Sequence, residues 1–183
     1  MSISLSEITS ATFIQMLEAL SGILEKAKSY VEARRVDEAV LLETRLIPDM
    51  FSFSRQVQLA CDFARRPAAL LAGVEFPDYP NDEKTLSDLQ ARIAKTVKFI
   101  RSLEAGMINQ ATGRRISFSA RRIDRVMRGA DYLMRSAIPN FYFHVVTAYD
   151  ILRQCGVEIG KSDFVTMAIY EKFDLSEKTR AER

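Results

Sequence analysis

The sequence predicts an all-α fold: an antiparallel four-helix bundle with a short β-hairpin between its third and fourth long helices. Three observations support this prediction. Apolar residues recur at steps of three and four along four long stretches, which is the spacing of an amphipathic helix. The chain has only 7 glycines and 5 prolines, too few for a turn-rich sandwich or barrel. The four helical stretches show no internal repeat, and such a set of helices is typical of a bundle.

The first helix has a clear start and a clear end. Ser4 followed by Glu7 has the spacing of a capping box, in which each residue satisfies a free backbone N–H of the first turn. The amphipathic stretch behind this box predicts one long helix. It should end near Arg34 and Arg35, whose positive charge suits the C-terminus of a helix.

The second helix is expected to contain an irregularity. Asp37 can cap its start, and the apolar pattern continues to Gly73. Pro48 lies within this pattern and predicts a kink or an opened turn, because proline has no N–H to donate. Pro67 predicts a second irregularity before the helix ends. The proline-containing stretch 74–82 is expected to be a loop.

The third helix should begin at another capping signal, Thr85 with Asp88, and end near Gly106. The helical period is then lost. Alternation of apolar and polar residues over 116–119 predicts a short strand, paired across a turn with residues 123–127.

The fourth helix is predicted over 130–155, interrupted by Pro139. Gly156 followed by an apolar residue is typical of a left-handed helix end. Residues 156–164 are expected to form an extended segment that lies on the bundle. Residues 1–165 would then form one domain, and 166–183 a charged tail that is partly helical or frayed.

Composition excludes several classes of function. The chain is 48% hydrophobic and 27% charged, which is ordinary for a folded, soluble domain. A formal net charge of +2 provides no strong field, so neither nucleic acid nor a membrane surface is an expected partner. The N-terminal segment has no signal-peptide pattern, and Cys61 and Cys155 are expected to be reduced core thiols. We therefore expect a cytoplasmic protein.

Polar residues gather around the only histidine, His144, on the fourth helix. Asn140 lies one turn before it, and Asp49 and Gln56 share a flank of the second helix. A bundle can bring these four side chains together at one end of its core. They can bind a polar ligand, or His144 and Asp49 can act together as a general base. The alternative is a core histidine whose nitrogens only tie helices together. For the histidine considered by itself this alternative has the greater weight, because buried polar networks often only stabilise a fold.

Two further features, the possible metal ligands and the arginine-rich stretch, give weaker indications of function. One histidine and two distant cysteines do not make a zinc site, so no metal and no other cofactor is expected. Seven arginines between residues 114 and 135 can contact phosphates or an acidic partner. They have little aromatic interleaving, however, and acidic residues elsewhere offset their charge. A solvated surface is therefore the favoured interpretation of this cluster.

Three segments carry a resemblance to a known family: SISLSEITSATFIQMLEALSGIL, RLIPDMFSFSRQVQLACD and ADYLMRSAIPNFYFHVVTAYDILRQCGVEIGKSDF. The chain resembles an uncharacterised bacterial and fungal domain-of-unknown-function family, similar to the DinB/YfiT-like helical bundles, over roughly residues 1–165. The resemblance implies the bundle fold and a homodimer formed through bundle helices. DinB-like proteins often hold a divalent metal on three histidines. Here the matching positions are Asn140 and His144, with Asp49 or Gln56 on the second helix, so that set is not retained.

The favoured function is therefore that of a metal-free protein that binds a small organic molecule between helices. The pocket would lie beside His144, Asn140, Asp49 and Gln56 and be lined by Phe53, Phe141 and Tyr149. The first alternative is an isomerase or hydrolase in which His144 is the general acid or base, Asp49 orients it and Asn140 holds a substrate carbonyl. The second alternative is a structural dimerisation module without a pocket.

Overall fold

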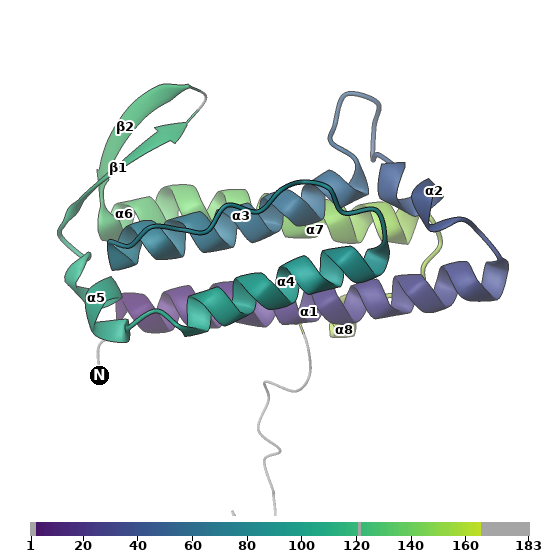
Figure 1. Ribbon diagram of the computed structural model, residues 1–183, viewed down its shortest axis with the longest axis horizontal. Coiled ribbons are helices and arrows are strands. Elements are labelled where there is room, and N and C mark those ends of the chain that lie inside the picture. Colours follow the sequence, from purple (N-terminus) through teal and green to yellow (C-terminus); the bar gives the residue numbers. More distant parts are fainter. Residues whose placement is uncertain (1–2, 121, 166–183) are drawn as a thin grey trace, which may run out of the picture.

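Four long helices form the body of the molecule, in a computed structural model that describes residues 3–120 and 122–165 (Figure 1). They are α1 (Leu5–Arg34), α3 (Phe53–Ala72), α4 (Leu86–Arg101) and α7 (Ile138–Gln154). Helices α3 and α7 form one layer, and α1 and α4 form the other. The predicted four-helix bundle with a hairpin before its last long helix is confirmed.

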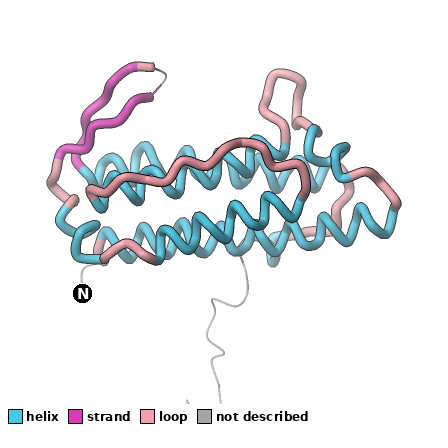
Figure 2. The backbone as a smooth tube through the Cα atoms, in the orientation of Figure 1, coloured by secondary structure: helices cyan, strands magenta, loops and turns pink. Residues whose placement is uncertain are grey.

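The helices are not connected in simple up-and-down order. Contacts between the two layers show that α3 and α4 run in the same direction, because Gln58 contacts Glu83 and Asp62 contacts Arg92 further along both segments. Helices α1 and α4, and likewise α3 and α7, are antiparallel (Figure 1). The segment between α3 and α4 must therefore return along the whole bundle. We call residues 74–85 the crossover, and Figure 2 shows it as the long loop that follows α3.

Local sequence signals account for α1. The Ser4 side chain accepts a hydrogen bond from the Glu7 N–H, and Glu7 Oε2 accepts one from the Ser4 N–H, so the predicted capping box is present. The helix ends where predicted, at Arg35, which adopts a left-handed conformation with φ 56°. Its buried stripe faces the other three helices.

The predicted second helix is two helices: the chain is interrupted at Pro48 as expected, but by a loop over residues 44–52 and not by a kink or a single opened turn. After α2 (Glu38–Glu43), the chain leaves helical geometry at Thr44 and resumes it only at Phe53, the start of α3. Pro48 explains the break, because it cannot donate to a helical ladder and disfavours helical geometry in the residue before it. The Phe53 N–H donates to the Thr44 carbonyl at 2.8 Å and closes this loop. The prediction of an irregularity at Pro67 was wrong, because α3 continues through Pro67 to Ala72 and is capped by Gly73, which has φ 74°.

The segment after the crossover follows most of the sequence signals. The Thr85–Asp88 capping box opens α4. This helix ends earlier than predicted, at Arg101, and a short helix α5 (Ala105–Gln110) follows. The predicted hairpin is confirmed: β1 (Arg115–Ala120) pairs with β2 (Ile123–Arg128) in an antiparallel register. Figure 2 shows this hairpin extending away from the helices.

The hairpin leads into the last long helix through a crowded glycine. A Cβ on Gly129 would lie 2.0 Å from the Ala111 carbonyl oxygen, so only glycine fits there. Helix α6 (Gly129–Tyr132), the π-helical turn η1 (Leu133–Ala137) and α7 follow without a break. The wider turn accommodates Pro139 at the start of α7, where a missing N–H costs least.

The C-terminal part is extended for a shorter distance than predicted. Gly156 has φ 88°, and the Val157 N–H donates to the Leu152 carbonyl, which is the predicted helix end. Helix α8 (Lys161–Val165) then packs against α1, where the sequence predicted extended chain. The predicted tail, 166–183, lies outside the described residues. Within the described residues, no helix is both long and apolar enough to cross a bilayer.

Candidate functional site

The structure brings together two of the predicted polar residues, His144 of α7 and Gln56 of α3. Their side chains meet between two antiparallel helices, with the imidazole Nδ1 2.7 Å from the amide Oε1 of Gln56. Both are nearly enclosed: His144 is 7% exposed and Gln56 is 1% exposed. A hydrogen bond this well buried is stronger than one in water, and it joins α3 to α7.

The orientation of the amide determines which imidazole nitrogen carries the proton. Gln56 Nε2 donates to the Phe51 carbonyl at 3.3 Å, so Oε1 is the atom that faces the imidazole. Because Oε1 accepts only, His144 Nδ1 must donate. The neutral tautomer then carries its proton on Nδ1 and leaves Nε2 as a lone-pair acceptor. Among the described residues, no protein group donates a hydrogen bond to Nε2.

Two aromatic rings enclose the imidazole. Phe63 stacks on it with ring centroids 5.2 Å apart, and Phe143 meets it edge to face at 5.3 Å. Phe63 belongs to α3, which forms one side of the site, and Phe143 directly precedes His144 on α7. Phe143 is itself 56% exposed. The site is therefore an imidazole held between aromatic rings, one of which reaches the surface.

This environment keeps His144 neutral. Burial and, to a smaller extent, the nearby Arg55 guanidinium lower its pKa from 6.5 to about 4. Both effects disfavour the imidazolium: burial removes hydration, and Arg55 adds like charge. At neutral pH His144 is therefore a hydrogen-bond acceptor at Nε2 and carries no charge.

The other predicted polar residues do not join this pair. Asp49 is exposed in the loop between α2 and α3, because the chain is not helical there. Asn140 is exposed, and its Nδ2 donates to the Ser136 carbonyl at 2.7 Å. Within the described part of the chain, neither residue makes a hydrogen bond or ion pair with His144.

The predicted aromatic lining is mostly core. Phe53 and Phe141 are fully buried, and Phe141 packs edge to face on Phe13 at 4.9 Å. Tyr149 is half-buried against Phe164 of α8, with ring centroids 5.6 Å apart. None of these three rings contacts the imidazole in the way that Phe63 and Phe143 do. Sequence reasoning missed Phe63, although it lies seven residues after Gln56 and so on the same face of α3.

The residues present do not fit the three-histidine metal set of DinB-like proteins. His144 Nδ1 is already hydrogen-bonded, Gln56 supplies an amide, and the Asn140 amide donates to its own helix. Amides are poor substitutes for imidazole as ligands of zinc or nickel. Across residues 3–120 and 122–165, no three histidine, cysteine or acidic side chains are grouped so that they could hold a metal ion.

A second polar cluster, which sequence reasoning missed, lies between α3, α4 and the crossover. We call it the arginine network, and it consists of Asp62, Arg65, Glu83 and Arg92. Asp62 Oδ1 accepts from Arg65 Nη2 at 2.8 Å and from Arg92 Nη2 at 3.1 Å, and Glu83 Oε1 accepts from Arg92 Nη1 at 2.8 Å. The Arg65 side chain is 0% exposed and that of Arg92 is 2% exposed.

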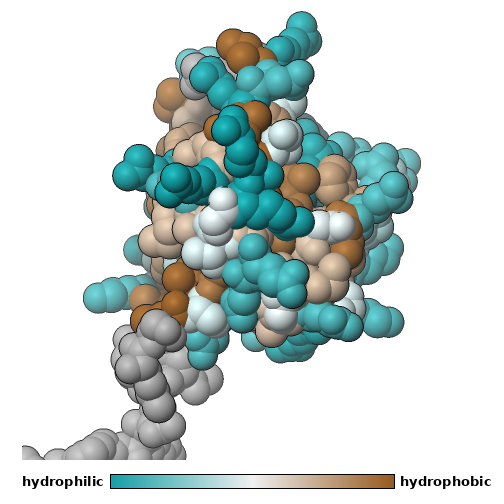
Figure 3. Space-filling model, turned by 90° about the vertical axis from the view of Figure 1, so that its left-hand side faces the viewer, coloured by the Kyte–Doolittle hydropathy of each residue, from teal (hydrophilic) through white to brown (hydrophobic). Residues whose placement is uncertain are grey.

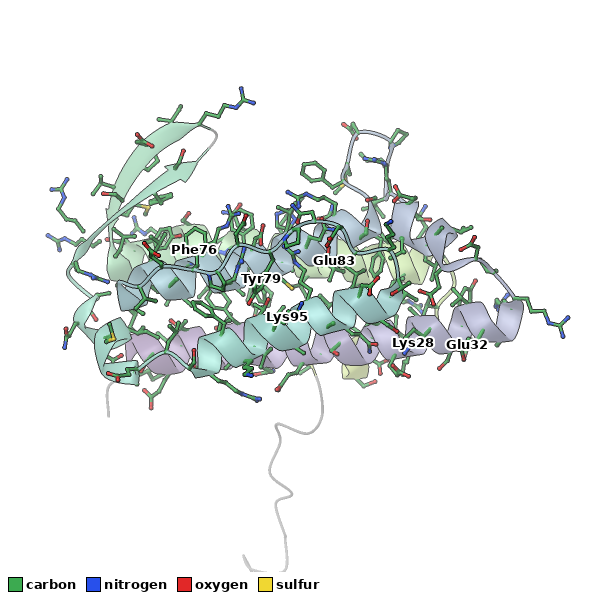
Figure 4. All side chains as sticks on the ribbon, in the orientation of Figure 1. Lys28, Glu32, Phe76, Tyr79, Glu83 and Lys95 are labelled. Atoms are coloured by element: carbon green, nitrogen blue, oxygen red, sulfur yellow. The ribbon has the colours of Figure 1, made fainter. Side chains whose placement is uncertain are left out.

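The arginine network fastens the crossover to the bundle. Arg65 donates to the Pro77 carbonyl, and Arg92 donates to the Pro80 carbonyl at 2.8 Å. The Tyr79 ring covers the Arg65 guanidinium at 4.1 Å. Figure 4 shows Phe76, Tyr79 and Glu83 in order along this segment. A sequence signal existed: Arg65 and Arg92 both interrupt the buried stripes of their helices.

His144 lines neither of two surface cavities on the described part of the molecule. One of about 290 Å³ lies between the crossover and α4, beside Tyr79, Glu83, Arg92 and Lys95. Another of about 450 Å³ lies by the C-terminal half of α1, beside Lys26, Tyr30 and Glu158. Cys61 is fully buried, and burial raises its pKa to about 12, so its thiol is unreactive.

The order and packing of the helices define the class of protein, a helical bundle with a long crossover connection. Residues 5–165 match the domain-of-unknown-function family DUF1993, and the chain belongs to that family. Among solved structures, a DinB family member protein from Shewanella denitrificans is 38% identical. The match covers 92% of this chain and 96% of that one, with a TM-score of 0.83. No curated protein sequence matches. The resemblance inferred from sequence is thereby confirmed.

Proposed function

We propose that this protein binds a small organic molecule at His144 without a metal. The observation that carries the proposal is the imidazole itself. It is neutral, oriented by Gln56 through Nδ1, and has no protein donor to Nε2 among the described residues. Nε2 is not fully buried, so a ligand's N–H or O–H can reach it and replace water there.

The surroundings of His144 favour an aromatic ligand with a hydroxyl group. Phe63 and Phe143 supply aromatic surface on two sides of the imidazole. Phe143 is more than half exposed, so its ring can move without disturbing the core. Binding sites for small molecules are typically apolar with a few placed polar groups, and His144 would be the polar group here.

A general-base role has less support than binding. A base works best when its pKa is close to the operating pH, and that of His144 is lowered to about 4. Asp49, the expected orienting residue, has no contact with His144, and Gln56 holds the ring in its place. A neutral amide does not stabilise an imidazolium as a carboxylate does. The site therefore suits hydrogen bonding better than proton abstraction.

The structural alternative has one observation in its favour. His144 is only 7% exposed, and its bond to Gln56 joins α3 to α7. If joining helices were its whole role, His144→Gln would reduce stability and no added molecule would perturb the ring. The predicted homodimer is a further proposal, and its test is the oligomeric state in solution.

The single histidine makes a direct test possible, because its ring signals in an NMR spectrum need no assignment. We would titrate the full chain with phenol, which can donate to Nε2, and with anisole, which cannot. Phenol is expected to shift the His144 ring signals saturably, and anisole to shift them at least several-fold less. Equal responses to both compounds, or no response to phenol, would overturn the proposal.

A zinc titration tests the metal-free part of the proposal. Zinc ions are expected to leave the His144 ring signals unchanged at one equivalent. A saturable shift at one equivalent would show that His144 still binds metal as in DinB-like relatives. His144→Phe serves as the matched variant, since it keeps an aromatic ring but removes the acceptor, and it should abolish the phenol response as detected by heat of binding.

A further inference from the structure

The outer face of the β-hairpin presents two arginines side by side. The register places Arg115 directly opposite Arg128, and Val126 opposite Ser117 on the same face. All four are exposed, Val126 at 48%. The other face turns toward the bundle, where Ile116 joins the core. Viewed from the end that carries the hairpin, Figure 3 shows hydrophilic side chains projecting around small apolar patches.

Arg115 and Arg128 form a non-hydrogen-bonded cross-strand pair, the type of pair in which the two Cα atoms are closer together. The Gly129 N–H donates to the Arg114 carbonyl at 2.9 Å, and hydrogen-bonded pairs alternate with non-hydrogen-bonded ones along an antiparallel ladder. Arg115 and Arg128, the next pair, are therefore non-hydrogen-bonded, with their Cα atoms closer together. Like charges directly opposite destabilise a hairpin. Among the described residues, no carboxylate forms an ion pair with either arginine.

The same alternation determines which backbone groups are available. Asp124 and Val126 belong to non-hydrogen-bonded pairs, so their N–H and C=O groups point away from β1 toward the outer edge of β2. The Arg128 N–H points the same way, but the Arg128 carbonyl is the N-cap of α6 and accepts the first hydrogen bond of that helix. In the described chain the sheet has two strands only, and no third strand covers that edge. All residues of β2 except Met127 are exposed. An uncovered edge with free backbone groups is where an extended peptide can add.

Charge decides among the possible occupants of this edge. A second copy pairing through β2 would bring together two hairpins of the same net positive charge, which is less favourable than an acidic partner. Each hairpin carries the single carboxylate of Asp124 against Arg115, Arg122, Arg125 and Arg128. A nucleic acid would meet Asp124 and Val126 on the same strand, and Phe118, the aromatic residue of the hairpin, is turned inward onto Tyr132 with ring centroids 4.6 Å apart. An acidic peptide would instead neutralise the arginines and cover Val126.

We infer that the outer edge of β2 binds an extended acidic peptide segment of another protein as an added strand. The partner's carboxylates pair with Arg128 on the outer face and with the exposed Arg125 on the opposite face, and an apolar side chain of the partner covers Val126. Its backbone takes up the free N–H and C=O groups of β2. This binding would relieve the repulsion between Arg115 and Arg128, which explains why the chain tolerates that pair. The surface is separate from His144, so the inference does not depend on the proposed function.

Fluorescence anisotropy with the full chain tests this inference. The probe is a short fluorescein-labelled peptide of repeating Glu-Glu-Val-Val, compared with the Gln-Gln-Val-Val analogue and with a short oligothymidylate. The variant Arg125→Gln/Arg128→Gln is expected to bind the acidic peptide about fivefold more weakly or worse. The control Arg34→Gln/Arg153→Gln removes the same charge from exposed helix ends and should change binding by less than twofold.

A second variant tests the added strand itself. Val126→Pro removes the outward N–H without removing a ladder hydrogen bond and should abolish peptide binding, whereas Val126→Thr should retain it. Circular dichroism would confirm that the helices are intact in every variant. Tighter binding of oligothymidylate than of the acidic peptide would overturn the inference in favour of a nucleic-acid surface. It would also be overturned if the control lost as much affinity as the hairpin variant, or if no acidic peptide bound at low salt.

Discussion

The two buried polar clusters of this bundle differ in almost every physical respect. The arginine network consists of charged groups, and it connects two helices to the crossover through Asp62, Arg65 and Arg92. The His144–Gln56 pair is neutral and connects two helices only to each other. In the network, carboxylates and crossover carbonyls accept hydrogen bonds from both terminal nitrogens of each guanidinium. At His144 one nitrogen has no protein donor among the described residues. An unpaired nitrogen occurs in both clusters, since the Nε atoms of Arg65 and Arg92 also lack a partner in the described chain, but those two atoms are fully buried. The His144 ring instead lies beside Phe143, which is 56% exposed, so access from the surface is the better indicator of a binding role.

The arginine network also shows the cost of its structural role. In the described residues, the Nε atoms of Arg65 and Arg92 are buried and have no hydrogen-bond partner. Each such donor costs about 1–3 kcal/mol. The network is retained because the crossover connects two parallel helices and has no strand or helix of its own. Side chains from α3 and α4 must hold it in place, and arginine reaches several carbonyls at once.

The largest expected effect comes from breaking the arginine network. Asp62→Ala leaves two nearly inaccessible guanidinium groups without their shared carboxylate. Removing one partner of a buried ion pair costs about 3–5 kcal/mol, because the remaining charge is buried and unpaired. Urea unfolding of the variant would measure the loss. A loss below about 1 kcal/mol would show that the network contributes little to stability.

A smaller effect is expected from pH, through His144. Its pKa is 6.5 in an ordinary setting and about 4 in the folded protein, so between these values the unfolded chain binds more protons. The contribution of His144 to stability is therefore complete above pH 6.5 and is lost as the pH falls toward 4. Each pH unit between the two pKa values corresponds to about 1.4 kcal/mol, so the total is roughly 3 kcal/mol.

The variant His144→Gln isolates this contribution, because glutamine does not titrate and can still bond Gln56. Urea unfolding at pH 7.5 and pH 4.5 should show a smaller pH dependence in the variant than in the wild type. Equal pH dependence in both proteins would mean that His144 is not neutralised by burial.

The next effect tests the role of Gln56. Gln56→Leu keeps the approximate volume but removes the acceptor for His144 Nδ1. Leaving that donor unpaired should cost about 1–3 kcal/mol. Gln56→Glu should instead raise the pKa of His144, because a carboxylate favours the imidazolium, and NMR titration of the single histidine would measure the rise. A carboxylate that left the pKa unchanged would contradict the assigned contact.

The smallest effect is expected at an exposed ion pair, which serves as the reference for the others. Glu18 and Arg101 join α1 to α4 at 2.7 Å, but both side chains are more than half exposed. Glu18→Gln should change stability by less than about 1 kcal/mol, because water screens the pair and competes with it. Thermal unfolding at low and high salt would check this. A loss as large as that of Asp62→Ala would remove the contrast between buried and exposed pairs.

The sequence by itself determined the parts of this protein that depend on neighbours in the chain. Capping residues Ser4, Asp37 and Thr85 open helices where predicted, and Gly73 and Gly156 end them, because these signals act within one turn. The hairpin could be predicted for the same reason. The extent of the second helix could not be predicted. Pro48 indicates an interruption, but the length of the loop depends on the hydrogen bond between the Phe53 N–H and the Thr44 carbonyl, which are nine positions apart.

Only the tertiary structure decided which polar groups meet. Gln56 and His144 are 88 positions apart, and Asp62 and Arg92 are 30 apart, so no local spacing relates them. The direction of α4 made the difference. An up-and-down connection would have placed α4 antiparallel to α3, whereas the crossover returns the chain and brings Arg92 to Asp62. Local hydrogen bonds specify where helices begin and end, but the packing of their apolar faces selects their neighbours, and with them the site.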